Sequence, residues 1–144
     1  MIDRRTLIAA GGLLLLFPRM GFAVAREDRL RMRDLYNEDM SFSDLAQAME
    51  GQRVAVKGFM APPLRAETRF YVLTNDPKWT CPFCDDASAW PEDILAVYSK
   101  RFVKVMPVDL PIAAEGILRL GTYKDLETGF VSRVRLEDAE YSRV

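Results

Sequence analysis

The sequence contains no histidine, only two cysteines and no excess of charge of one sign, since 20 Lys+Arg stand against 21 Asp+Glu. The absence of histidine excludes Ser-His-Asp and Cys-His mechanisms and every metal site that uses an imidazole ligand. Because nucleic-acid-binding proteins concentrate basic charge, the balanced composition also argues against a nucleic-acid partner. What is present, 49% hydrophobic and 28% charged residues over 144 positions, is typical of one compact domain.

The N-terminal segment has the layout of a cleaved export signal. It combines a basic start, an apolar run and a small-residue cleavage site, namely Arg4-Arg5, Leu7–Phe17 and Ala23-Val24-Ala25. The apolar run is shorter than the about 20 residues that a membrane-spanning helix needs, so a permanent membrane anchor is not expected. We predict export to the periplasm, with cleavage after Ala25 removing residues 1–25.

The paired arginines favour one export route. Arg4-Arg5, followed by Thr6-Leu7-Ile8, resembles a twin-arginine signal, which a translocase reads as an address. Such signals usually carry cargo that is already folded. Because Asp3 precedes the pair, a general secretion signal that begins with two arginines is the alternative.

Residues 26–50 are predicted to form a charged helical extension. Charge is dense from Arg26 to Asp39, and the few apolar residues among them, including Leu30 and Leu35, have roughly helical spacing. This pattern predicts a solvated helix or an extension lying on the domain, and we place no site there.

A short helix is expected at the end of this extension, over residues 44–50. Ser41 or Ser43 can accept a hydrogen bond from the first turn as its N-cap. Gly51 supplies the left-handed residue that commonly ends a helix.

From residue 51 to residue 144 the hydrophobic pattern changes from a helical period to a period of two, which predicts strands. Gly58 inside the first of them predicts a bulge or a sharp bend. The turn-rich segment 124–129 joins the last two as a hairpin. The expected strands cover residues 54–60, 70–74, 94–98, 113–123 and 130–136.

Five strands with a long insertion at residues 77–93 predict a mainly β protein, a five-stranded OB-like Greek-key barrel with a short N-terminal helical extension. A β-sandwich is the alternative, although the segment is short for seven strands.

Met60 and Met106 are predicted as core residues rather than thioether ligands for copper. Arg133 and Arg135 alternate with apolar residues, as on the solvated face of a strand.

The most distinctive chemistry lies in the insertion, where Cys81-Pro82-Phe83-Cys84 holds both cysteines. In an oxidising compartment two thiols at this spacing can pair as a disulfide. A bridge over so short a loop would restrain little of the unfolded chain, which shifts weight toward a chemical role.

Two chemical roles suit the pair. Reduced, the thiolates of Cys81 and Cys84 are half of a tetrahedral zinc shell. The nearby carboxylates Asp85, Asp86, Glu92 and Asp93, water, or the same loop of a second protomer in a homodimer can complete it. Alternatively, the Cys-Pro-aromatic-Cys string looks like a glutaredoxin active site, with Cys81 as the attacking thiol. The strand-rich sequence that follows argues against a thioredoxin-like fold.

Trp79, Phe83 and Trp90 surround the pair as a recognition pocket or as cover for one end of the barrel.

Several segments together resemble a family of small exported bacterial proteins of unknown function, with a twin-arginine signal and a Cys-Pro-Phe-Cys motif on an OB-like barrel. The likeness covers about residues 41 to 141, and it is carried by residues 51–64, Phe70–Thr74, Cys81-Pro82-Phe83-Cys84, Trp90-Pro91 and residues 128–132. It implies an accessory of an envelope ABC-type transport system, in some settings linked to zinc. Cys81 and Cys84 carry over, with Trp90 as a neighbour, and no catalytic residue does.

The sequence contains no phosphate-binding loop, nucleophile elbow, calcium loop or internal repeat. We therefore expect a periplasmic binding or accessory protein that is not an enzyme. Its site would be Cys81 and Cys84 binding zinc, and its partner another envelope protein or a transporter component. The alternatives are a thiol–disulfide redox protein that uses the same two cysteines, and a protein-interaction module in which they form a structural disulfide.

Overall fold

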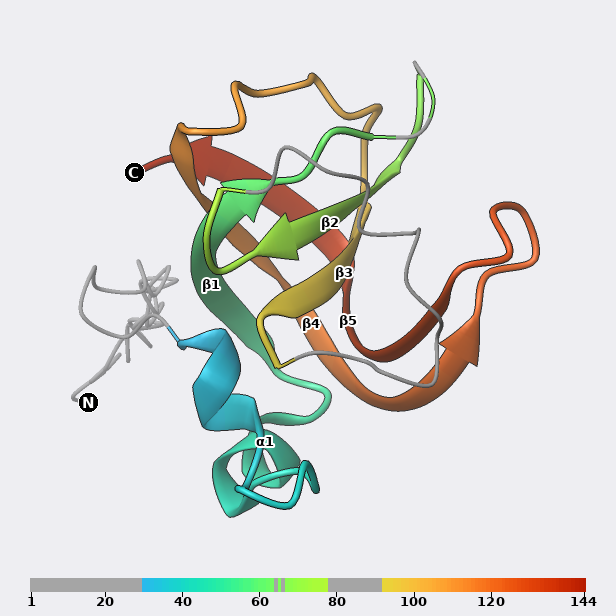
Figure 1. Ribbon diagram of the computed structural model, residues 1–144. Helices are drawn as coiled ribbons and strands as arrows, with labels where there is room; N and C mark the ends of the chain where they lie inside the picture. Colours follow the sequence, from blue (N-terminus) through green and yellow to red (C-terminus); the bar gives the residue numbers. More distant parts are fainter. Residues whose placement is uncertain (1–29, 64, 66, 78–91) are drawn as a thin grey trace, which may run out of the picture.

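The computed structural model describes residues 30–63, 65, 67–77 and 92–144 (Figure 1). These residues form a short 3-10 helix, one short α-helix and five strands, so the prediction of a mainly β protein with five strands and little helix is confirmed. The elements are η1 (Met32–Leu35), α1 (Asp44–Met49), β1 (Arg53–Met60), β2 (Phe70–Thr74), β3 (Ile94–Ser99), β4 (Pro111–Lys124) and β5 (Val131–Arg143).

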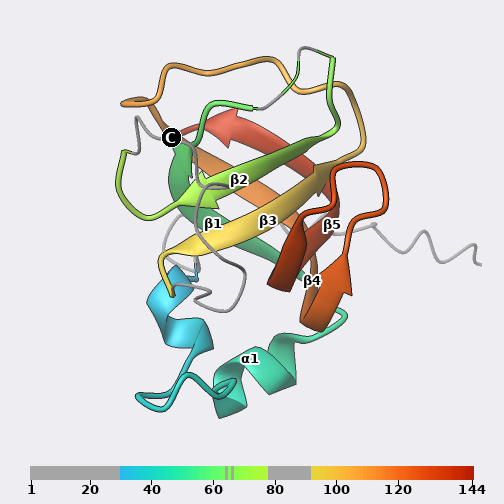
Figure 2. The same cartoon turned by 45° about the vertical axis from the view of Figure 1, so that its right-hand side comes forward.

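The five strands form one sheet that closes on itself (Figures 1 and 2). Their order is β1-β2-β3-β5-β4, and β1 pairs with β4 as well as with β2. All neighbours are antiparallel except β3 and β5, which run parallel. The interior is filled by large side chains that are less than 2% exposed, among them Tyr71, Leu73, Leu95, Ile112, Leu118 and Leu136.

Strand β1 serves both of its neighbours in turn. Residues Arg53 to Phe59 pair with β4, and Phe59 and Met60 pair with β2. Of the bulge or sharp bend expected at Gly58, a bulge toward β4 is not present, because the register with β4 runs without a shift through the pair Gly58–Ile112. Glycine is needed for a different reason: a Cβ atom there would lie 2.6 Å from the carbonyl oxygen of Thr74.

Of the two forms expected for the charged segment before α1, the structure has the extension lying on the domain and not the solvated helix. Leu30 forms a bridge with Val56, and Met32 and Leu35 are 1% and 0% exposed on either end of η1. A 3-10 helix has three residues per turn, so two apolar side chains three positions apart point the same way and enter the core together. The charged neighbours Arg31 and Arg33 remain exposed.

Helix α1 begins where the sequence predicts and settles the choice of cap. The hydroxyl oxygen of Ser43 accepts a hydrogen bond from the backbone N–H of Ala46 over 3.1 Å, whereas Ser41 contacts Asp39 and Asn37 instead. The chain leaves the helix through Gly51, which has the expected left-handed backbone with φ of 78°.

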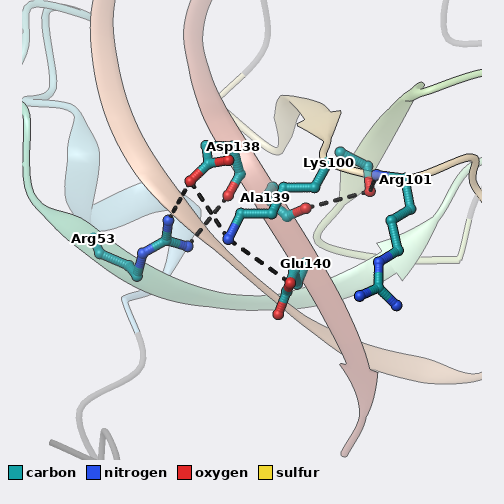
Figure 3. Close-up of polar contacts among 7 residues, drawn as sticks. Arg53, Lys100, Arg101, Asp138, Ala139 and Glu140 are labelled. Carbon is teal, nitrogen blue, oxygen red and sulfur yellow. Dashed lines mark hydrogen bonds and ion pairs between the residues drawn. The ribbon is translucent and has the colours of Figure 1, made fainter. Parts of the chain in front are cut away.

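The predicted hairpin of β4 and β5 is present. In its turn, one carboxylate oxygen of Asp125 accepts hydrogen bonds from the backbone N–H groups of Glu127 and Thr128. Strand β5 continues beyond the predicted end at Leu136, through acidic residues of low β propensity. The side chain of Arg53 binds the Asp138 carboxylate over 2.7 Å at the point where the β4–β5 register shifts, which ties β1 to this part of β5 (Figure 3).

Candidate functional site

The residues that the sequence predicts as the site lie outside the described residues. They are Trp79, Cys81, Phe83, Cys84, Asp85, Asp86 and Trp90. The structure does place the two points from which this segment departs and to which it returns, at Pro77 after β2 and at Glu92 before β3. These two chain positions form the base of the predicted site.

Backbone pairing holds this base together. Thr74 and Ile94 are cross-strand partners at the ends of β2 and β3, and the next residue out, Asn75, donates its backbone N–H to the carbonyl oxygen of Asp93 over 2.8 Å. The segment 78–91 thus spans two chain positions that adjacent strands hold side by side. A short distance between the ends lowers the entropy that a loop must lose to adopt one conformation.

Thr74 reinforces the same base from the interior. Its side chain is fully buried, and its hydroxyl group is hydrogen-bonded to the carbonyl oxygens of Phe59, at 3.2 Å, and Asp76, at 2.7 Å. Phe59 belongs to β1, so the threonine links the loop base to a third strand. The carbonyl of Thr74 also faces the Cα of Gly58, where no side chain intervenes.

Described carboxylates at the base are sparse. Asp76 and Glu92 are exposed at the two ends of the segment, and Asp93 is half-buried. Across residues 30–63, 65, 67–77 and 92–144, no three His, Cys, Asp or Glu side chains lie together as a metal site would require. The zinc hypothesis therefore depends on Cys81, Cys84 and their neighbours in the segment.

A second feature, an aromatic cluster, lies on β2, β3 and the β4–β5 hairpin. Phe70 packs against Tyr98 with ring centroids 5.1 Å apart and against Phe130 at 5.2 Å, and Tyr98 meets the edge of Tyr123 at 5.8 Å. Because β2 and β3 pair Phe70 with Tyr98 directly, the sheet register creates the first of these contacts. Residues 70, 98, 123 and 130 form this cluster.

One hydroxyl group of the cluster is buried. The Tyr98 oxygen is buried, with no hydrogen-bond partner at normal distance among the described residues. Burial raises the pKa of Tyr98 well above its usual value, and the nearby negative charge of Asp125 raises the pKa further. Tyr98 therefore stays neutral over the physiological range.

Arg135 covers one side of this cluster, contrary to the solvated face expected for it. Its guanidinium carbon lies 4.4 Å from the centre of the Tyr123 ring, and its Nε donates to Glu137 over 2.8 Å. Only 15% of the side chain is exposed. Arg133 is held in a similar way over the rings of Tyr36 and Phe42.

Sequence reasoning missed these arginines because the contact of Arg135 depends on the exact register of the β4–β5 hairpin, and the contacts of Arg133 join distant segments. The alternation of Arg133 and Arg135 with apolar residues signals two faces of a strand, but it does not show that aromatic rings from elsewhere cover the polar face. The expectation for Met60 and Met106 is confirmed, since both are buried in the core.

Comparison with known proteins gives a likeness of fold. No family model matches the chain, and no curated protein matches it. Among solved structures, the crystal structure of a DUF3299 family protein from Pseudomonas aeruginosa PAO1 is similar, with a TM-score of 0.51 and 12% sequence identity over 81% of this chain and 95% of that one. At this identity the likeness shows the fold alone.

Neither of the two described helices has the length and apolar character needed to cross a bilayer.

Proposed function

We propose that the protein is an exported, periplasmic binding or accessory protein without enzymatic activity, built on an OB-like Greek-key barrel. The strand pairing supports this architecture, because β1 passes from β4 to β2 and β3 lies parallel to β5. Such small barrels commonly use the loops between their strands for binding. The insertion between β2 and β3 is the binding element in this proposal.

The ligand we propose is a soft divalent metal, with zinc as the first candidate, bound by the reduced thiolates of Cys81 and Cys84. The observation that carries the proposal is the hydrogen bond from the Asn75 backbone to Asp93, which closes the base of the loop. A metal site gains affinity when the chain around its ligands is already constrained. Asp85, Asp86, water or a second protomer's loop would complete the shell.

The described secondary structure does not match the thioredoxin-like fold that a glutaredoxin-like active site would imply. A thioredoxin-like fold packs long helices against its sheet, whereas the described residues contain one α-helix of six residues and one 3-10 helix of four. Thiol–disulfide exchange by Cys81 and Cys84 on another scaffold is the rival function, and a structural disulfide in a protein-interaction module is the third. By resemblance, the physiological partner would be a component of an envelope ABC-type transport system.

The test is a thiol count and zinc titration on protein kept without oxygen. Reduced wild-type protein, titrated against a chromophoric zinc chelator, is expected to bind one zinc per protomer, or one per pair of protomers if two loops share it. The double variant Cys81→Ser/Cys84→Ser is expected to lose this binding. The matched control is Asp76→Asn, which changes an exposed carboxylate at the loop base that is not among the candidate ligands and should retain it.

Two outcomes would overturn the metal assignment. Reduced wild-type protein that takes up no zinc would exclude it directly. Protein from the periplasm in which Cys81 and Cys84 are fully oxidised and no metal is bound would also exclude it. The redox function and the structural disulfide would then remain. A potential in the range of known exchange proteins would then favour redox chemistry, and a much lower potential a structural bridge.

A further inference from the structure

A cationic patch with two exposed apolar side chains lies at the edge of the molecule formed by the β1–β2 and β3–β4 connections. Phe102 is 63% exposed and Val105 is 58% exposed. Four exposed cationic side chains lie in the same two connections. We call this set, Arg65, Arg69, Arg101, Phe102, Lys104 and Val105, the loop patch.

The segment that carries Phe102 and Val105 is held firmly. The backbone N–H of Val103 donates to the carbonyl of Thr68 over 2.7 Å, which joins the two connections. The hydroxyl group of Tyr141 accepts from the Lys104 N–H at 2.7 Å and donates to the Lys104 carbonyl at 2.9 Å. These bonds leave the backbone little freedom, so binding through this segment costs little ordering entropy.

The exposure of Phe102 and Val105 is a consequence of how the segment is anchored. Val103 and Met106 point inward, each 8% exposed, and they bind the segment to the core. The residues that lie between or before these inward positions, including Phe102 and Val105, remain at the surface. In both views the segment between β3 and β4 runs along the outer edge of the molecule (Figures 1 and 2).

The cations of the loop patch outnumber the two exposed carboxylates of the same connections, Glu67 and Asp109, and they form no ion pair with them. Lys100 at the start of the segment has ionic partners, since its amino group lies 3.5 Å from Asp138 and 3.8 Å from Glu140. The guanidinium of Arg101 next to it has none in the same close-up (Figure 3). Within the described part of the chain, no ion pair involves the four cations of the loop patch.

One contact joins the apolar and cationic parts. The guanidinium carbon of Arg69 lies 5.1 Å from the centre of the Phe102 ring. The Arg69 guanidinium therefore lies beside the exposed Phe102 ring, so both groups would contact the same binding surface. The whole chain is nearly neutral, with a formal charge of −1, so any attraction to an anionic surface must come from a local group of cations such as this one.

We propose that the loop patch binds the surface of an anionic phospholipid bilayer, with the Phe102 and Val105 side chains at the level of the headgroups. An aromatic and an aliphatic side chain gain from leaving water at this interface, and the surrounding cations are attracted by lipid phosphates. The patch is carried on an outer edge, which suits a flat, extended surface. This proposal goes beyond the metal-binding function and uses neither Cys81 nor Cys84.

The experiment is co-sedimentation with vesicles of phosphatidylethanolamine and phosphatidylglycerol, compared with vesicles of phosphatidylcholine alone. Wild-type protein is expected to sediment with the anionic vesicles and to be released by added salt. Arg69→Gln/Arg101→Gln/Lys104→Gln is expected to weaken binding by about fivefold per cation removed. Phe102→Ser/Val105→Ser is expected to weaken it at least about tenfold.

Matched controls separate the loop patch from general surface effects. Leu126→Ser removes an apolar side chain that is 94% exposed in the β4–β5 turn, and Arg31→Gln/Arg33→Gln removes two exposed cations near η1. All proteins are prepared with the same N-terminus, verified by intact mass, so that any contribution from residues 1–25 is shared. Unfolding temperatures confirm that each variant is folded.

A local readout makes the proposal independent of bulk binding. Phe102→Trp places a fluorophore on the loop patch, and its added emission is expected to shift to the blue with anionic vesicles and to be quenched by brominated lipids. Unchanged emission, or patch variants that sediment like the controls, would overturn the proposal. Binding to soluble polyglutamate without vesicle binding would also overturn it and assign the patch to an acidic protein segment.

Discussion

The backbone of Gly58 on β1 lies so close to Thr74 on β2 that a Cβ atom at position 58 would be 2.6 Å from the Thr74 carbonyl oxygen. The same atom would lie 2.8 Å from the Leu73 and Met32 side chains. Three segments thus meet at one point beneath the base of the cysteine loop. The absence of a side chain at position 58 is what allows the sheet, the 3-10 helix and the loop base to pack together.

Gly58→Ala is therefore expected to destabilise the protein by about 1–3 kcal/mol, since the added methyl group meets backbone that cannot move freely. The measurement is the midpoint of urea unfolding. Lys57→Ala, at the exposed neighbouring position of the same strand, is the control and should change stability little. An unchanged midpoint for Gly58→Ala would mean that β1 and β2 can separate without cost.

Met32→Ala tests whether the segment before α1 is part of the core. The Met32 side chain is 1% exposed, so its truncation is expected to cost about 2–5 kcal/mol through lost burial and the cavity left behind. Arg33→Ala, in the same helix and exposed, should have a small effect. Equal unfolding midpoints for the two variants would contradict the packing of η1 into the core.

Tyr71 gives a prediction about alkaline pH. Burial raises the pKa of its hydroxyl group far above the ordinary value of about 10. Above pH about 10 the unfolded chain loses this proton while the folded chain retains it, so the free energy of unfolding decreases as the pH rises. Tyr71→Phe is expected to reduce this decrease, measured by urea unfolding at several pH values, with the more exposed Tyr123→Phe as the control.

The same variant has an expected result at neutral pH. The Tyr71 hydroxyl is buried without a hydrogen-bond partner among the described residues, so replacing it with hydrogen removes an unsatisfied polar group. Tyr71→Phe should be as stable as the wild type at pH 7, or more stable. A clear loss of stability there would show that the hydroxyl has a partner.

The export route is tested at the arginine pair. Arg4→Lys/Arg5→Lys keeps the charge of the signal, but it is expected to abolish export if a twin-arginine translocase reads the pair. Wild-type protein from the periplasmic fraction should begin at Arg26 by intact mass, and the variant should remain in the cytoplasm at full length. Normal export of the variant would favour the general secretion route instead.

Much of the fold could be predicted because its signals are local. The strand Phe70–Thr74 was predicted with its observed bounds, since an apolar β-branched and aromatic run is followed by Asn75-Asp76-Pro77. The turn at Asp125 and the cap at Ser43 depend on hydrogen bonds to residues two or three positions away. Such contacts are determined by spacing along the chain.

The candidate site could be predicted only in part from such local signals. Cys81 and Cys84 stand out by residue type and spacing, and they remain a prediction because they lie outside the described residues. The base of their loop could not be predicted from the sequence. The backbone hydrogen bond from Asn75 to Asp93 forms only when β2 and β3 have paired. The loop patch was missed because Arg69 and Phe102 lie on separate connections.

The sequence by itself thus determined the β character, the positions of the turns, the short capped helix and the residue types available for soft-metal or thiol chemistry. Only the tertiary structure decided that the sheet closes through β1 and β4, that Met32 enters the core and that Arg135 covers Tyr123. The physical reason is the range of the interactions. Turns and caps are made by neighbours in the chain, whereas burial and ring contacts depend on distant segments that meet only in the folded protein.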